Sequence, residues 1–180
     1  KSFAVKCKEA GISDIRAYFE ILESLGSKIE YISKNEVIID NSEINSAIAS
    51  YELTSKFRAS YYLIGSLLGR FDDVQISLPG GCNLGARPID QHIKGFEALG
   101  AKITLENGLV EANAKELNGA SIYLDVVSVG ATINIMLAAV KAKGLTVIEN
   151  AAREPHIVDL ANFLNTMGAN IMGAGTNIIK

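Results

Sequence analysis

The spacing of apolar residues repeats along this 180-residue chain. Three segments place apolar side chains at relative positions 0, 4, 7 and 10 and are followed by glycine, at Gly26, Gly100 and Gly168. This spacing predicts a helix with one buried face, and glycine suits the left-handed residue that ends a helix. We therefore predict three surface helices. Their apolar positions are Ile15, Phe19, Leu22 and Leu25; Ile89, Ile93, Phe96 and Leu99; and Ile157, Ala161, Leu164 and Met167.

Other elements alternate with these helices. Alternating polar and apolar residues after each of these helices predict two-stranded hairpins, and the Asn107-Gly108 pair is a typical hairpin turn. The glycine-rich segment GAGTN near the end of the chain matches the hairpin of the third repeat. Residues 51–78 align without a gap on residues 123–150. Each of these segments contains a long run without charge, and a helix with no polar face is buried. The predicted repeat is strand, buried helix, strand, surface helix and hairpin.

The repeat also predicts how the chain is divided. We expect a single lobe with repeats at roughly 1–40, 41–114 and 115–180. The first repeat starts at its second strand, so its first strand and first buried helix are missing from this sequence. We interpret the chain as a truncated form of a longer protein.

Charge and cysteine content narrow the class of protein. The net charge is −3, from 17 basic and 20 acidic residues, without the basic excess of a nucleic-acid-binding protein. Two cysteines do not form a disulfide framework, which favours a reducing cytoplasm. The longest uncharged stretch, residues 126–140, is shorter than the ~20 residues of a membrane span. We expect a cytoplasmic protein that does not bind nucleic acid.

The segment SLPGGCNLGARP, residues 77–88, holds one of the two cysteines. A free cysteine is often a small buried hydrophobic residue. The surrounding glycines predict an exposed loop instead, and the nearby Arg87 would favour the thiolate of Cys82. Both interpretations stay open on this evidence. Cys7 lies in an alternating segment and is interpreted as a strand residue without chemistry.

Two helix starts are further candidates. Arg87, Pro88 and Asp90 open the second surface helix, where proline and acidic residues are ordinary capping residues. The same helix start could bind an anion through free amides and the arginine fork, so the two interpretations are compatible. Ser128 either caps a buried helix or contacts a ligand.

Arg58 is the third candidate. It begins the other buried helix, where its repeat equivalent is Gly130, so the fold does not require the arginine. His92 and His156 have no second ligand nearby in the sequence, which argues against a metal site.

Four segments resemble the UDP-N-acetylglucosamine enolpyruvyl transferase family: RASYYLIGSLLGRF, LPGGCNLGARPIDQHIKGFEALGA, DVVSVGATINIMLAAV and IENAAREPHIVDLANFLNTMGA. The resemblance covers residues 12–180, and the cysteine loop is its most specific part. It implies an α/β (α+β) lobe of the inside-out barrel type, built from βαβαββ units about a pseudo-threefold axis. A second lobe would complete the substrate cleft. The implied reaction moves the enolpyruvyl group of phosphoenolpyruvate to the 3-hydroxyl of UDP-N-acetylglucosamine, with no metal and no organic cofactor.

The resemblance also implies roles for individual residues. Cys82 matches the family's proton donor, which can form a phosphoenolpyruvate adduct and is alkylated by fosfomycin. The residues implied in substrate binding are Arg58, Arg87, Pro88, Ile89, Asp90, Gln91, Val127, Ser128, Val129 and Gly130. Within that set, Arg87 lies near the phosphates, and the segment 127–130 contacts the uridine nucleotide.

Three departures and three rival interpretations accompany this resemblance. Val126 stands where some members have lysine, and the family's N-terminal Lys-Asn pair and whole second lobe are absent. We therefore expect the chain alone to be inactive.

The shikimate-pathway enolpyruvyl transferase shares the fold but not the cysteine loop. A cysteine hydrolase or redox enzyme would need a partner for its thiol. A ligand-binding or scaffold module of the same fold remains the alternative function.

Overall fold

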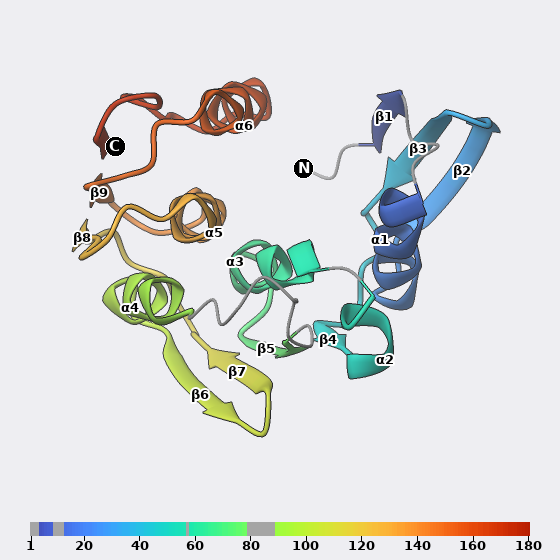
Figure 1. The fold of residues 1–180 in the computed structure, drawn as a ribbon, viewed down its shortest axis with the longest axis horizontal. Coiled ribbons are helices and arrows are strands. Elements are labelled where there is room, and N and C mark those ends of the chain that lie inside the picture. Colours follow the sequence, from blue (N-terminus) through green and yellow to red (C-terminus); the bar gives the residue numbers. More distant parts are fainter. Residues whose placement is uncertain (1–3, 9–12, 57, 79–88) are drawn as a thin grey trace. The chain divides into compact units, whose positions relative to one another are not determined.

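The computed structural model describes residues 4–8, 13–56, 58–78 and 89–180 (Figure 1). These residues fall into two compact units, and each is described here by itself. Unit 1 lies within Lys1–Tyr61, Gln75–Gly81 and Glu106–Val110. Unit 2 lies within Tyr62–Val74, Cys82–Leu105 and Glu111–Lys180.

The order of helices and strands follows the predicted repeat except after α6, where the structure has one strand, β10, in place of the predicted two-stranded hairpin. The helices are α1 (Ser13–Ser24), α2 (Tyr51–Thr54), the 3-10 helix η1 (Arg58–Tyr61), α3 (Tyr62–Leu68), α4 (Asp90–Ala98), α5 (Val129–Ala139) and α6 (Pro155–Thr166). The strands are β1 (Ala4–Lys8), β2 (Lys28–Ser33), β3 (Glu36–Asp40), β4 (Ile48–Ala49), β5 (Asp73–Ser77), β6 (Lys102–Glu106), β7 (Leu109–Asn113), β8 (Ser121–Tyr123), β9 (Val147–Glu149) and β10 (Ile178–Ile179).

Unit 1 contains a sheet of strand order β1-β3-β2, in which β3 pairs antiparallel with both neighbours. Helix α1 contacts β2, and Phe19 and Val37 are buried between helix and sheet. The ring of Phe19 meets Tyr31 edge-on, with ring centroids 6.3 Å apart. This packing buries the apolar face predicted for the first surface helix. Strand β4 of the same unit pairs in parallel with the part of β5 that starts at Gln75.

Unit 2 is organised around the buried helix α5, which contacts α3, α4 and α6. Its close approach to α3 depends on Gly65, whose N–H donates to Asn134 Oδ1 at 2.8 Å. Asn134 and Ile135 are fully buried. Strand β9 pairs in parallel with β8 and antiparallel with β10. The prediction of apolar, buried helices in both complete repeats is confirmed.

The turns also follow the sequence pattern. Gly26, Gly100 and Gly168 end their helices with φ of 103°, 97° and 103°, which only glycine adopts without strain. Asn107 and Gly108 have φ of 50° and 77° in the β6–β7 hairpin, as a two-residue turn of the primed type requires.

The two aligned segments differ at two places. Residues 58–61 form the 3-10 helix η1, whereas the equivalent residues 130–133 belong to α5. Residues 51–54 form the short helix α2, whereas the equivalent residues 123–126 end a strand and continue as a loop. Thr54 Oγ1 donates to the Ser50 carbonyl within α2. In the other repeat, Gln91 and Lys94 of α4 hydrogen-bond to Asp125, so contacts with another helix decide the local conformation.

No helix in the described ranges is long and apolar enough to cross a membrane.

Candidate functional site

The predicted site residues divide into two groups. Cys82, Arg87 and Pro88 lie outside the described residues, as does the side chain of Arg58, whose backbone begins η1. Their predicted roles therefore stay predictions. The remaining residues lie in unit 2, at the start of α4 and in the loop that leads into α5.

Gln91 joins these two segments. Its Oε1 accepts from the backbone N–H of Asp125 at 2.8 Å, and its Nε2 donates to Asp125 Oδ2 at 3.2 Å. The same Nε2 lies 3.2 Å from Asp90 Oδ2. Gln91 is only 6% exposed, so its amide is committed to protein contacts. Helix α4 therefore fixes the position of the loop before α5.

Lys94 completes this contact, one helical turn after Gln91 on the same face of α4. Its Nζ donates to Asp125 Oδ1 at 2.7 Å. The hydrogen bond from Lys94, followed by that from Gln91, lowers the pKa of the Asp125 carboxyl below its ordinary value. We call Gln91, Lys94 and Asp125 the clamp.

The loop after the clamp is fixed at its far end too. Ser128 Oγ accepts from the backbone N–H of Ala131 at 3.2 Å and so caps α5. Thr132 Oγ1 donates to the Ser128 carbonyl and accepts from the Ala152 N–H. Ser128 is thus a helix cap, as one of the two interpretations predicted, and its possible ligand contact stays a prediction.

The fixed loop presents both apolar and polar groups. Val126 and Val127 are each 59% exposed, although valine is among the residues most often buried in proteins. Val129 and Gly130 begin α5, where backbone N–H groups have no partner within the helix. This arrangement can hold a ligand by apolar contact and by hydrogen bonds. Its one hydroxyl, Ser128 Oγ, already accepts the capping hydrogen bond, so chemistry would come from residues outside it.

His92 belongs to the core of unit 2. It is 6% exposed, and its Nδ1 lies 3.1 Å from Asn134 Nδ2. Asn134 also accepts from Gly65, so three helices are linked through one side chain. Among the described residues, no group of three or more His, Cys, Asp or Glu side chains is placed to hold a metal ion.

Sequence reasoning missed Lys94 and Asp125. Asp125 is separated from its two partners by more than 30 residues, and no local pattern marks such a contact. One signal was present, because Gln91 and Lys94 have the three-residue spacing that places side chains on one helix face.

We expect the Asp125 carboxyl to titrate below its ordinary pKa of 3.8 when its side-chain carbon is followed by NMR. Because the folded-state pKa is below the unfolded one, the clamp stabilises the protein above pH about 4 and this contribution is lost as the pH falls through the folded-state value. Lys94→Met should raise the Asp125 pKa. Lys102→Met, at an exposed lysine of β6, should leave it unchanged. Equal titration curves in the two variants would contradict the clamp.

Comparison with known families and proteins gives matches over nearly the whole chain. A family model described as EPSP synthase (3-phosphoshikimate 1-carboxyvinyltransferase) matches residues 10–180. Curated proteins named UDP-N-acetylglucosamine 1-carboxyvinyltransferase 3, from Caldanaerobacter subterraneus, and 2, from Clostridium acetobutylicum, are each 61% identical over 169 residues. Each alignment covers 94% of this chain and 40% of the relative. The chain thus spans less than half the length of these relatives.

Solved structures with low sequence identity share the fold. The enolpyruvyl transferase NikO from Streptomyces tendae superposes with a TM-score of 0.81 at 22% identity, over 98% of this chain and 42% of that chain. EPSP synthase from Acinetobacter baumannii gives a TM-score of 0.72 at 22% identity, over 98% of this chain and 40% of that one. The predicted α/β fold class, an enolpyruvyl-transferase lobe, is confirmed.

Proposed function

Because the chain belongs to the EPSP synthase (3-phosphoshikimate 1-carboxyvinyltransferase) family, we propose that it is the cysteine-bearing lobe of a UDP-N-acetylglucosamine 1-carboxyvinyltransferase. The observation that carries this proposal is the 61% identity, over 169 residues, to relatives of that name. The relatives are longer, which is consistent with a second lobe that completes the enzyme.

The proposed reaction transfers the enolpyruvyl group of phosphoenolpyruvate to UDP-N-acetylglucosamine, the first committed step of peptidoglycan synthesis. A bond forms between the 3-oxygen of the sugar and the central carbon of the enolpyruvyl group. The bond from that carbon to the phosphate oxygen breaks, and inorganic phosphate leaves. Neither a metal nor an organic cofactor takes part in the proposed scheme.

Cys82 is the proposed proton donor. Addition to the double bond requires a proton at the methylene carbon of phosphoenolpyruvate, and a thiol near a reacting carbon can supply it by general acid catalysis. The sugar hydroxyl gives up its proton as its oxygen adds, and the new methyl group loses a proton as phosphate leaves, which restores the double bond. We assign Arg87 to the substrate phosphates, because a guanidinium binds phosphate oxygens with two parallel hydrogen bonds. Arg58 is assigned to substrate binding by the same resemblance. These roles come from the match of motifs in the sequence.

The clamp supports the proposed nucleotide site. The implied nucleotide contacts lie in two segments, residues 87–91 and 127–130, and Gln91 ties the first to the loop that begins the second. A ligand held by both segments needs them at a fixed spacing, because catalysis depends on orientation. We therefore propose that Gln91 acts mainly by positioning the loop, since its amide is already hydrogen-bonded.

The experiment that tests this function measures phosphate release from phosphoenolpyruvate and UDP-N-acetylglucosamine. The chain alone is expected to release no measurable phosphate, because transition-state stabilisation needs groups from both lobes. Addition of the separately expressed remainder of a longer relative is expected to restore release.

A titration of UDP-N-acetylglucosamine by calorimetry distinguishes the alternative. Binding without phosphate release, even with the second lobe present, would identify a ligand-binding module of the same fold. Phosphate release by the chain alone at a rate near that of a complete relative would contradict the two-lobe proposal.

A further inference from the structure

Asn150 has a backbone conformation that is unusual for a residue with a side chain. Its φ is 56°, in the left-handed region, and among the described residues other than glycine only Asn107 shares this feature. Asn107 belongs to the two-residue turn of the β6–β7 hairpin, which requires a positive φ. Asn150 lies between β9 and α6, outside any hairpin. Backbone strain away from such turns is concentrated at functional sites, which makes Asn150 a candidate.

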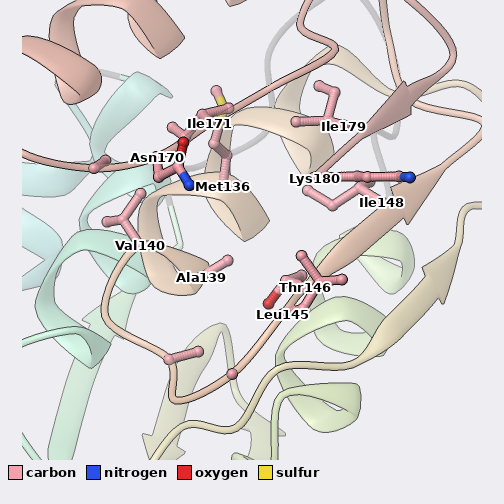
Figure 2. Close-up of a pocket in the computed structure, with 13 residues that line it drawn as sticks. Met136, Ala139, Val140, Leu145, Thr146, Ile148, Asn170, Ile171, Ile179 and Lys180 are labelled. Atoms are coloured by element: carbon pink, nitrogen blue, oxygen red, sulfur yellow. The ribbon is translucent and has the colours of Figure 1, made fainter.

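Strand β9 fixes the backbone that leads to Asn150. It is the central strand of the sheet β10-β9-β8, and Ile148 in its middle is buried. Figure 2 shows Ile148 beside Ile179 of β10, its partner in the antiparallel pair. On the other side of β9, Ile148 pairs with Ile122 of β8. Asn150 therefore follows a strand that is held by both of its neighbours.

The side chain of Asn150 continues the pairing of β9 with β8. Beyond the last paired residues of these strands, the Leu124 N–H donates to the Glu149 carbonyl at 3.0 Å. Asn150 Nδ2 then donates to the Leu124 carbonyl at 2.8 Å. Leu124 is fully buried, and the next residue is Asp125 of the clamp. Asn150 therefore holds the chain where strand β8 ends and the loop of residues 125–128 begins.

The residues after Asn150 hold the other end of the same loop. The Ala152 N–H donates to Thr132 Oγ1 at 3.0 Å, and Thr132 Oγ1 donates to the Ser128 carbonyl at 2.8 Å. Ala152 is itself fully buried. Asn150 and Ala152 are two positions apart, so one short segment sets the spacing between the start and the end of the loop.

The other complete repeat shows that the fold does not require an asparagine here. Leu78 follows β5 as Asn150 follows β9, and its φ is not positive. Glu52, the repeat equivalent of Leu124, lies within helix α2 and not at the end of a strand. The left-handed asparagine thus occurs in the repeat that has the loop, and leucine occurs in the repeat that has a helix in its place.

We propose that Asn150 is a positioning residue for nucleotide binding. Its amide holds the loop of residues 125–128 in one conformation, so that Ser128 and the start of α5 are in place before a ligand arrives. Asn150 acts through the Leu124 carbonyl and not by contact with the ligand. This role rests on the proposed function, in which residues 127–130 contact the nucleotide. A loop that is ordered in advance costs less free energy to fix on binding, so loss of this order lowers the affinity.

Asn150→Gly separates the hydrogen bond from the backbone conformation. Glycine adopts the left-handed conformation without strain, so the variant loses the bond to Leu124 and keeps the turn. In the two-lobed protein we expect the KM for UDP-N-acetylglucosamine to rise roughly 3- to 10-fold, the equivalent of one hydrogen bond. The kcat should be unchanged, as is typical of an interaction that acts only on binding. Tm should stay close to that of the parent, because relief of strain offsets the lost bond.

Hydrogen exchange at Asp125 reports on the loop without any ligand. The Asp125 N–H donates to Gln91 Oε1, and this bond opens when the loop leaves its position. In this chain, Asn150→Gly is expected to accelerate exchange of the Asp125 amide roughly 10-fold.

Asn107→Gly is the matched control, because it makes the same change at the other left-handed asparagine, in the β6–β7 turn. It should equal the parent in KM, Tm and exchange. Asn150→Asp is a second variant that keeps the size of the side chain. Its ionised carboxylate cannot donate a hydrogen bond, so it should raise the KM in the same direction as Asn150→Gly.

The proposal is overturned if Asn150→Gly has the KM of the parent. It is also overturned if Tm and kcat fall together with the affinity, because Asn150 would then have only a structural role. Faster exchange at Asp125 in a protein whose parent form does not bind UDP-N-acetylglucosamine would overturn the proposed function and the nucleotide role with it, while confirming that Asn150 holds the loop.

Discussion

Gly65→Ala is expected to lower the free energy of unfolding of this chain by about 3 kcal/mol. A Cβ atom at this position would lie 2.2 Å from the Asn134 backbone oxygen and 2.4 Å from its Oδ1. Because the backbone of the buried helix α5 cannot move without disturbing its other contacts, α3 and α5 must separate. The bond from the Gly65 N–H to Asn134 is then weakened, and this loss outweighs the higher helix propensity of alanine. Urea unfolding followed by circular dichroism measures the change.

Gly69→Ala is the matched control for this prediction. Its Cβ would lie 2.8 Å from Lys141 Cγ, but Lys141 is exposed and its side chain is flexible. A change of rotamer can relieve that contact at a cost of roughly 1 kcal/mol, so Gly69→Ala should destabilise the chain much less. Equal stability of both variants would show that the contact between α3 and α5 is not close-packed in solution.

Cys82→Ala, made in the two-lobed protein, is expected to reduce phosphate release by about 10²- to 10⁴-fold, the range typical of a lost general acid. Its affinity for UDP-N-acetylglucosamine should be unchanged, since the proposed nucleotide contacts lie elsewhere. The measurement is steady-state phosphate release, with calorimetry for the affinity.

Cys7→Ala is the control, because Cys7 belongs to strand β1 and has no proposed chemistry. It should retain full activity. Iodoacetamide labelling with peptide mapping adds an independent readout, in which Cys82 reacts faster than Cys7 and Arg87→Ala slows the reaction of Cys82. Full activity of Cys82→Ala, or equal labelling of the two cysteines, would assign Cys82 a structural role.

The elements of the fold could be predicted because their causes are local. A helix with one apolar face can be recognised from the spacing of its apolar residues. The left-handed glycine after it is required by backbone sterics, as at Gly26, Gly100 and Gly168. The uncharged runs around α3 and α5 predicted burial for the same reason. Helix α2 could not be predicted, because residues 123–126, which align with it in the other repeat, form no helix.

The candidate site could be predicted only as separate segments. The resemblance implied substrate contacts for Gln91 and Ser128, and these stay predictions, but nothing local indicated that Gln91 would hold Asp125. Contacts between residues 34 positions apart depend on how helices pack. The same limit applies to Asn134, a polar residue of the largely apolar helix α5 that links α3, α4 and α5.

The bond between Gly65 and Asn134 has a consequence for how such a chain could have arisen from duplicated copies of one ancestral repeat. Its two partners do not occupy equivalent positions, since the equivalent of Gly65 is Leu137 and that of Asn134 is Tyr62. The contact therefore pairs a glycine that only one copy has with an asparagine that only the other copy has. It exists in this form because the two copies differ, and it distinguishes one repeat from the other. A permuted order of repeats would bury an asparagine without its donor.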